Sequence, residues 1–168
     1  MKKVVLILSS LALVASAFAA PASAMEFHGT TCSLTGAATI KPGLSMESGE
    51  YKVTFAGELT DCQTTGDATS GKVTAKAVAT GTCAEATAEG LATVKWDTKA
   101  KTTVEFSTTD IGALVILQGE VTRSTDTGLT KGDSVFGALA FNADPAECTG
   151  DGIEKASFEG QVLGGYPQ

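Results

Sequence analysis

Residues 51–60 read Tyr-Lys-Val-Thr-Phe-Ala-Gly-Glu-Leu-Thr and show the clearest alternation in the 168-residue sequence. Tyr51, Val53 and Phe55 share one side of the repeat with Gly57 and Leu59. Lysine, threonine and glutamate fill most of the positions between them. Because successive side chains of a strand point to opposite faces of the sheet, this period of two predicts a half-buried β-strand.

The same alternation recurs along the chain and is separated by turn motifs rich in glycine and aspartate. Further strands are predicted over 27–40, 72–80, 91–98, 102–109, 114–124, 134–143 and 153–163. Turns are predicted at 41–43, 65–67, 110–112, 126–128, 131–133 and 149–152. No segment has a convincing helical period, and the Ala-rich residues 83–90 are predicted to be a loop, with one helical turn as the alternative. The pattern predicts an all-β fold, an antiparallel β-sandwich or barrel of about eight strands.

Three of these strands carry a large apolar residue two positions before a glycine on the inward face. The pairs are Phe55 with Gly57, Leu117 with Gly119, and Phe158 with Gly160. Glycine inside a strand marks a bend or a close approach of another group, so these positions are predicted to be where the sheet coils. An internal repeat of a ligand-binding motif is the alternative.

Residues 1–24 have the features of a cleaved secretory signal peptide. Lys2 and Lys3 precede an apolar run over residues 4–18, and Ala22-Ser23-Ala24 fits the small residues that signal peptidase accepts. A membrane anchor is the alternative, but the apolar run is shorter than the roughly 20 residues of a spanning helix. We expect a mature single domain over residues 25–168, secreted or held at the cell envelope, with no transmembrane segment after cleavage.

The charge balance restricts the partners that this chain can bind. Removal of Lys2 and Lys3 takes the formal net charge from −7 to −9. Nucleic acids and anionic lipid surfaces need clustered lysine and arginine, so neither is an expected partner.

Four cysteines on an exported chain predict two disulfides, for which three pairings are possible. If the strands run alternately up and down, Cys32 and Cys62 lie at one end of the sheet, while Cys83 and Cys148 lie at the other. The pairs Cys32 with Cys62 and Cys83 with Cys148 are therefore predicted, since a whole strand separates the two ends. A metal site is the alternative, but the sequence has no CxxC motif and a single histidine.

One set of residues has the chain order of a serine protease triad. Gly132-Asp133-Ser134 resembles the Gly-Asp-Ser of serine hydrolases, and His28 with Asp61 or Asp97 precedes it. However, Ser134 opens an alternating strand and lacks the glycines of an oxyanion hole. We therefore expect no catalytic residues and no enzyme.

Two other features have a functional and a structural interpretation. The acidic residues Asp144, Glu147, Asp151 and Glu154 suggest calcium, yet their spacing fits no EF-hand loop, so a solvated loop without metal or other cofactor is expected. Trp96 is expected to fill the core, with an exposed ligand platform as the alternative.

Five short segments resemble small secreted β-proteins of actinobacteria that carry a leader and four cysteines. They are Cys32-Ser33-Leu34-Thr35-Gly36, Gly57-Glu58-Leu59-Thr60-Asp61-Cys62, Gly81-Thr82-Cys83, Val94-Lys95-Trp96 and Phe158-Glu159-Gly160-Gln161-Val162. The resemblance implies secretion, disulfides and an all-β fold, and that group has no assigned activity. The composition is also similar to the antitumour chromoproteins of streptomycetes, which bind a small molecule in an immunoglobulin-like cleft, although their disulfides close short local loops.

The sequence therefore predicts a non-catalytic binding module whose partner is an extracellular protein, a wall polymer or a small molecule. A small-molecule carrier would leave its inward positions small, as at Ala75, Ala77, Ala79, Gly137 and Gly160. A protein-binding module would instead expose an apolar patch or a loop anchored by a disulfide, for which residues 61–71 are the candidate.

Overall fold

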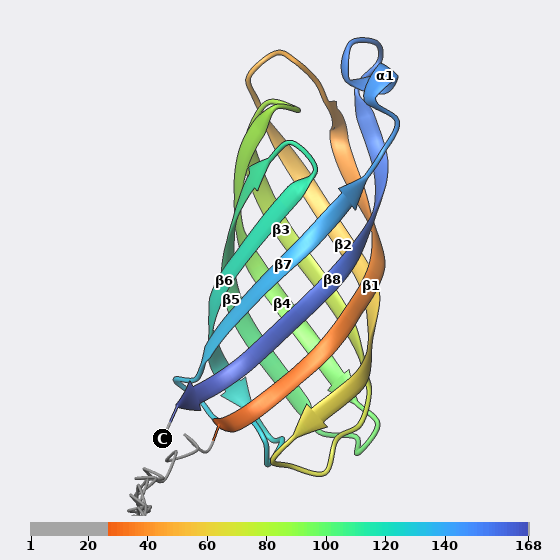
Figure 1. The fold of residues 1–168 in the computed structure, drawn as a ribbon. Coiled ribbons are helices and arrows are strands. Elements are labelled where there is room, and N and C mark those ends of the chain that lie inside the picture. The colour runs from red at the N-terminus through yellow and green to blue at the C-terminus, as the bar shows by residue number, and fades with distance from the viewer. Residues whose placement is uncertain (1–26, 168) are drawn as a thin grey trace, which may run out of the picture.

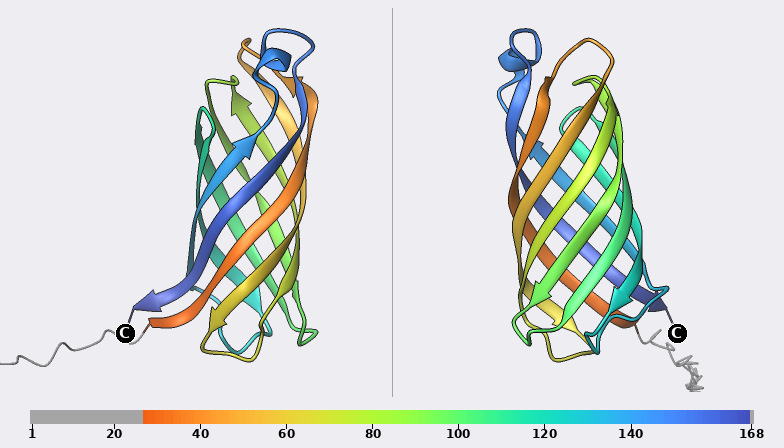
Figure 2. Two further views of the ribbon diagram at one scale, coloured as in Figure 1. Left: turned by 45° about the vertical axis from the view of Figure 1, so that its right-hand side comes forward. Right: turned by 180° about the vertical axis from the view of Figure 1, so that it is seen from behind.

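The computed structural model describes residues 27–167, which form one closed antiparallel barrel of eight strands (Figure 1). The strands are β1 (Phe27–Leu44), β2 (Gly49–Thr64), β3 (Gly71–Gly81), β4 (Glu85–Trp96), β5 (Lys101–Ile111), β6 (Leu114–Ser124), β7 (Ser134–Asn142) and β8 (Ile153–Pro167). A single helical turn, α1 (Pro145–Cys148), lies between β7 and β8. Each strand pairs with its neighbours in sequence, and β8 pairs with β1 to close the wall (Figure 2). The predicted all-β fold is confirmed, in the form of the barrel.

The alternation seen in the sequence separates the inside of the barrel from the outside. On β3 the odd-numbered residues from Val73 to Ala79 face inward, whereas Lys72, Thr74 and Lys76 are exposed. The same division holds on β4, where Ala92, Val94 and Trp96 face inward as predicted and Leu91 is exposed. Inward apolar side chains therefore fill or line the interior of the barrel.

The two ends of the barrel differ in their connections. The end that carries the β1–β2, β3–β4, β5–β6 and β7–β8 connections is called the mouth here, and it lies at the top of Figure 1. The opposite end, called the base, carries the other three connections, the start of β1 and the end of β8 (Figure 1).

Two loops close the base. Ala68 of the β2–β3 loop and Leu129 of the β6–β7 loop are buried, and both belong to the same hydrophobic core cluster as Trp96. The loops meet directly, because a Cβ atom on Gly66 would fall against the backbone of Gly128. Trp96 therefore fills the core, as predicted.

A polar contact lies within this closed base. The indole Nε1 of Trp96 donates a hydrogen bond to Thr102 Oγ1 at 2.9 Å. The Thr102 hydroxyl also bonds the Ser124 hydroxyl at 2.9 Å. These bonds satisfy polar groups that would otherwise be costly to bury.

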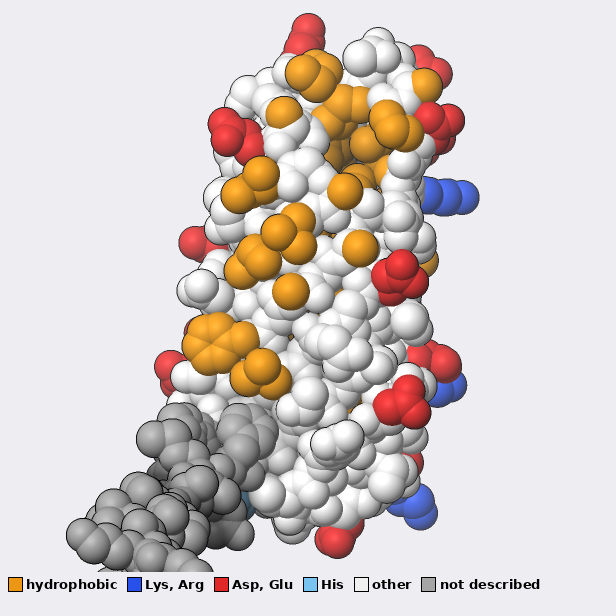
Figure 3. Space-filling view, viewed as in Figure 1, with side chains coloured by type: hydrophobic (Ala, Val, Ile, Leu, Met, Phe, Trp, Pro, Cys, Tyr) orange, Lys and Arg blue, Asp and Glu red, His pale blue; other side chains and the backbone are white. Residues whose placement is uncertain are grey.

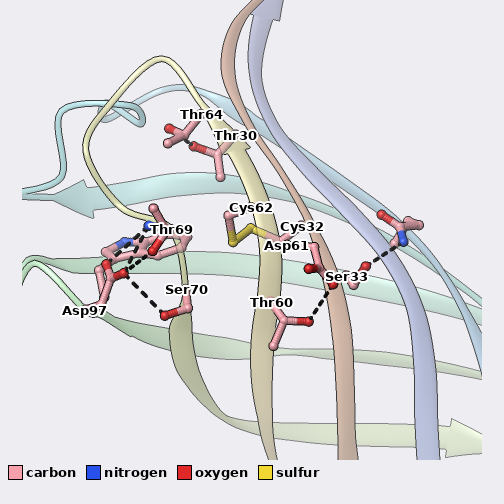
Figure 4. The surroundings of a disulfide bond; sticks show 12 residues. Thr30, Cys32, Ser33, Thr60, Asp61, Cys62, Thr64, Thr69, Ser70 and Asp97 are labelled. Carbon is pink, nitrogen blue, oxygen red and sulfur yellow. Dashed lines mark hydrogen bonds between the residues drawn. A yellow bond between two sulfur atoms is a disulfide. The ribbon is translucent and has the colours of Figure 1, made fainter.

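Both predicted disulfides are present. Cys32–Cys62 joins β1 to β2 near the base (Figure 4), and Cys83–Cys148 joins the β3–β4 turn to α1 at the mouth. The first bond depends on a bulge in β2, where the register with β1 shifts between Thr31 and Ser33 and Asp61 has a φ of 51°. The extra residue changes the alternation of β2, so that Cys62 faces Cys32.

Two local predictions were wrong, and a third, the turn at 110–112, was misplaced because β5 continues to Ile111. Residues 83–90 are not a loop, because β4 already begins at Glu85. The turn expected at 41–43 lies within β1, which continues to Leu44 and turns only at residues 45–48. The predicted signal peptide, residues 1–24, lies outside the described residues.

Candidate functional site: the barrel interior

The interior of the barrel is only partly filled. A cavity of about 180 Å³ lies within the barrel, and side chains from all eight strands line it. Several inward residues of the middle strands, such as Ala75, Ala77 and Phe106, are only half-buried because they face this space. An apolar cavity of about 150 Å³ is enough to bind benzene, so a small apolar molecule fits in this volume.

One side of the cavity is aromatic. The ring of Phe158 on β8 packs edge-to-face against Phe55 at 5.7 Å and against Phe141 at 5.3 Å, measured between ring centroids. Strand β1 runs between β2 and β8, and it carries Gly36 at this level. A Cβ atom there would lie 2.7 Å from Phe55 Cζ, so glycine leaves room for the rings to meet.

Most of the lining on the opposite side of the cavity is alanine, with Val73 and Val94 toward the base. The alanines are Ala75, Ala77, Ala79, Ala86, Ala88 and Ala92, all on β3 and β4. Three of them were predicted as small inward positions of a carrier. The other two predicted positions are Gly137 and Gly160. A Cβ atom at Gly137 would meet the side chain of Val162, and one at Gly160 would meet the backbone of Ala138. These two glycines therefore allow neighbouring strands to pack closely. The cavity thus exists because one side of the barrel has large side chains and the other has methyl groups.

The cavity reaches the surface at the mouth. In Figure 3 the surface is hollowed above the upper end of β7, and hydrophobic side chains are visible inside the hollow. Leu44, Ala86 and Asp110 lie near this end of their strands and belong to the cavity lining. The closed base and the open mouth give the cavity one route of access.

Among residues 27–167, Asp110 is the only charged residue that lines the cavity, and Thr108 is the only other polar one. Asp110 is half-buried at the upper end of β5, opposite Ala86 of β4 and Val115 of β6. Its Oδ1 atom is sealed from solvent and, among the described residues, has no hydrogen-bond partner. Burial raises the pKa of Asp110, and a hydrogen bond with Thr108 opposes part of that rise.

Asp110 was missed by the sequence analysis, which placed it in a turn after the strand 102–109. The missed signal was the alternation itself, because Thr102, Val104, Phe106 and Thr108 face inward and Asp110 continues the same series. Aspartate is rare in strands and common in turns, and this preference hid its inward position.

The residues of the hypothetical protease triad lie near the base. Asp97 accepts hydrogen bonds from Thr69 and Ser70, and Asp61 accepts one from Thr60 (Figure 4). The Thr69 side-chain bond is the main reason that the pKa of Asp97 lies below its usual value. His28 lies on β1 in register with Tyr166 of β8, and Ser134 is exposed at the start of β7. The two aspartates thus have structural partners in the barrel wall and loops.

The acidic residues 144–154 form the β7–β8 connection and the start of β8. Asp144 caps α1, where its Oδ1 accepts a hydrogen bond from the Ala146 backbone N–H at 2.9 Å. Within residues 27–167, no three histidine, cysteine or acidic side chains converge in a way that could hold a metal ion. Also within that range, the helical residues are limited to the four of α1, and no helix is long and apolar enough to cross a membrane.

Of the two features expected of a protein-binding module, the structure shows an exposed apolar patch but no projecting loop at residues 61–71. The candidate loop 61–71 does not project, because β2 continues to Thr64 and Ala68 is buried in the base. An apolar strip does lie on the outer face of β6, β7 and β8 (Figure 3), and it includes Leu114, Phe136 and Leu163, each at least 40% exposed. Phe136 and Leu163 are direct neighbours across β7 and β8.

The fold and cavity define a disulfide-linked, eight-stranded barrel with a hydrophobic interior that opens at one end. In searches against protein families, curated proteins and solved structures, no family model, curated protein or solved structure matches this chain.

Proposed function

We propose that this protein is a non-catalytic, exported binding protein that holds a small apolar molecule inside its barrel. The observation that carries the proposal is the cavity of about 180 Å³ behind an open mouth. Apolar surface transferred from water into such a space is favourable by about 25 cal/mol per Å². A cavity that reaches the surface lets a ligand enter without unfolding the barrel.

The cavity is a better candidate for function than the outer apolar strip. The strip lies on a convex barrel wall, whereas ligand sites are usually concave, apolar and supplied with few polar groups. The lining has that composition, with Thr108 and Asp110 as its polar members. A barrel of eight strands can hold one small ligand when its inward side chains are small.

Two features support export. Two disulfides fit an oxidising compartment, and residues 1–24 have the pattern of a signal peptide. Recovery from the culture medium of a chain that begins at Met25 tests this part of the proposal.

Binding of 1-octanol, measured by isothermal titration calorimetry, tests the ligand site. The wild-type protein should bind octanol, and Ala77→Leu should weaken binding at least tenfold because the added carbons occupy the cavity. Thr74→Leu is the matched control, since Thr74 is exposed on the outer face of the same strand. Absence of octanol binding to the wild type, or equal binding by both variants, would overturn the proposal.

A further inference from the structure

The position of Asp110 adds a chemical requirement to the cavity. Its Oδ1 atom is buried without a partner, although buried polar groups are normally hydrogen-bonded and a buried carboxylate is costly unless paired. On the neighbouring strands, the residues paired with Asp110 are Ala86 of β4 and Val115 of β6. Neither side chain can form a hydrogen bond or an ion pair with a carboxylate. Neither neighbouring strand thus supplies a partner for Oδ1, and a bound molecule can reach this atom through the mouth.

The charged residues at the mouth indicate the sign of the charge that a partner of Asp110 would carry. The mouth connections are residues 45–48, 82–84, 112–113 and 143–152, and they contain Glu47, Asp144, Glu147 and Asp151 but no lysine or arginine. The base connections also contain four acidic residues, Asp67, Asp97, Asp126 and Asp133, but there Lys99 and Lys131 offset part of the negative charge. A negative rim attracts cations to the mouth and repels carboxylates and phosphates.

We propose that the ligand is an apolar molecule with one amino group, whose ammonium binds the Asp110 carboxylate while its apolar part occupies the cavity. This inference rests on the proposed function and specifies the ligand of the same site. An ammonium group is cationic and donates hydrogen bonds, so it meets both the unpartnered Oδ1 and the acidic rim. Charge-assisted hydrogen bonds of this kind are roughly twice as strong as neutral ones.

The geometry also sets the orientation of the ligand. Asp110 lies at the mouth end of β5, whereas the apolar lining continues toward the base as far as Val73 and Val94. The apolar part must therefore enter first, and the ammonium group stays at the entrance, where part of its hydration is retained. Partial hydration reduces the cost of removing the charge from water.

Three ligands with the same eight-carbon chain test the inference: octylamine, 1-octanol and octanoate. Calorimetry at about 0.15 M salt limits non-specific attraction of the amine to the acidic surface. The wild type should bind octylamine about tenfold more tightly than octanol, and octanoate more weakly than both. In Asp110→Asn the preference for octylamine over octanol should fall below about threefold.

Glu85→Gln is the matched control, because Glu85 is exposed at the start of β4 beside the same rim. It removes one negative charge without changing the lining, and it should keep the preference for the amine. If the wild type binds octanol and octylamine equally, or if Asp110→Asn keeps the preference, the inference is wrong while the proposed function stands. If none of the three ligands binds, both are wrong. Thermal unfolding of Asp110→Asn, followed by circular dichroism, shows independently that the variant is folded.

Discussion

A buried carboxyl oxygen without a hydrogen-bond partner makes Asp110 a source of instability in the folded protein. Burial raises its pKa above the ordinary value of 3.8. Between 3.8 and the raised pKa the folded protein binds a proton that the unfolded chain does not bind. The stability of the fold therefore decreases as the pH rises through this interval.

The first prediction is that Asp110→Asn raises the melting temperature at pH 7. Because the side chain is only half-buried, we expect a gain of roughly 1 kcal/mol in the free energy of unfolding. The difference from the wild type should shrink as the pH falls and be small at pH 3, below the ordinary pKa of 3.8, where the wild-type carboxyl is mostly protonated in both states. Thermal unfolding followed by circular dichroism between pH 3 and 8 measures both effects. A lower melting temperature of the variant at pH 7 would contradict this account.

At the scale of the strands, Gly36 determines how β1 fits between β2 and β8. A Cβ atom at this position would lie 2.5 Å from the Ala56 carbonyl oxygen and 2.7 Å from Phe55 Cζ. Its contact with the backbone of the neighbouring strand cannot be relieved by a side-chain rotation alone. The same crowding beside a neighbouring carbonyl occurs at Gly57 and Gly119. Neighbouring strands thus approach closely at Gly57 and Gly119, two of the three glycines singled out in the sequence.

Gly36→Ala should therefore destabilise the barrel by about 2 kcal/mol, since it forces the Phe55 ring and β2 away from β1. Ala37→Ser is the control, because it adds one heavy atom at the next position, on the exposed outer face of the same strand. Urea denaturation gives the free energy of unfolding of each variant. Equal stability of the two variants would show that β1 can shift without cost.

The strands were predictable from sequence because alternation is a local property. The start of β4 was missed because Ala86 and Ala88 alternate with Glu85, Thr87 and Glu89, and alanine gives a weak apolar signal and has a low preference for strands. The choice between sandwich and barrel depends on the pairing of β1 with β8, which are far apart in the sequence. Alternation does not identify the partner of a strand, so neither closure nor the cavity could be derived from it.

At the scale of the whole molecule, each disulfide acts on one end of the barrel. Cys83–Cys148 connects residues 65 positions apart and ties α1 to the β3–β4 turn at the mouth. Cys32–Cys62 spans 30 positions near the base. A longer loop has more entropy in the unfolded chain, so its closure contributes more to stability in the chain-entropy model.

Replacement of both cysteines of a pair by serine should lower stability by about 4 kcal/mol for either disulfide. The loss at the mouth pair should exceed that at the base pair by about 0.7 kcal/mol, from the ratio of the loop lengths. Guanidinium denaturation of the two double variants without reductant measures this order. A larger loss for the base pair would show that folded-state packing around Cys32 and Cys62 outweighs chain entropy.

The start of β1 and the end of β8 both lie at the base, on the side away from the mouth (Figure 1). A bead, an electrode or a fused fluorescent protein attached through a linker after β8 would therefore project away from the entrance. Molecules immobilised in this way would all direct their openings toward the surrounding liquid. The barrel thus has the layout needed for an oriented layer, in which the mouth of every attached copy remains accessible from solution.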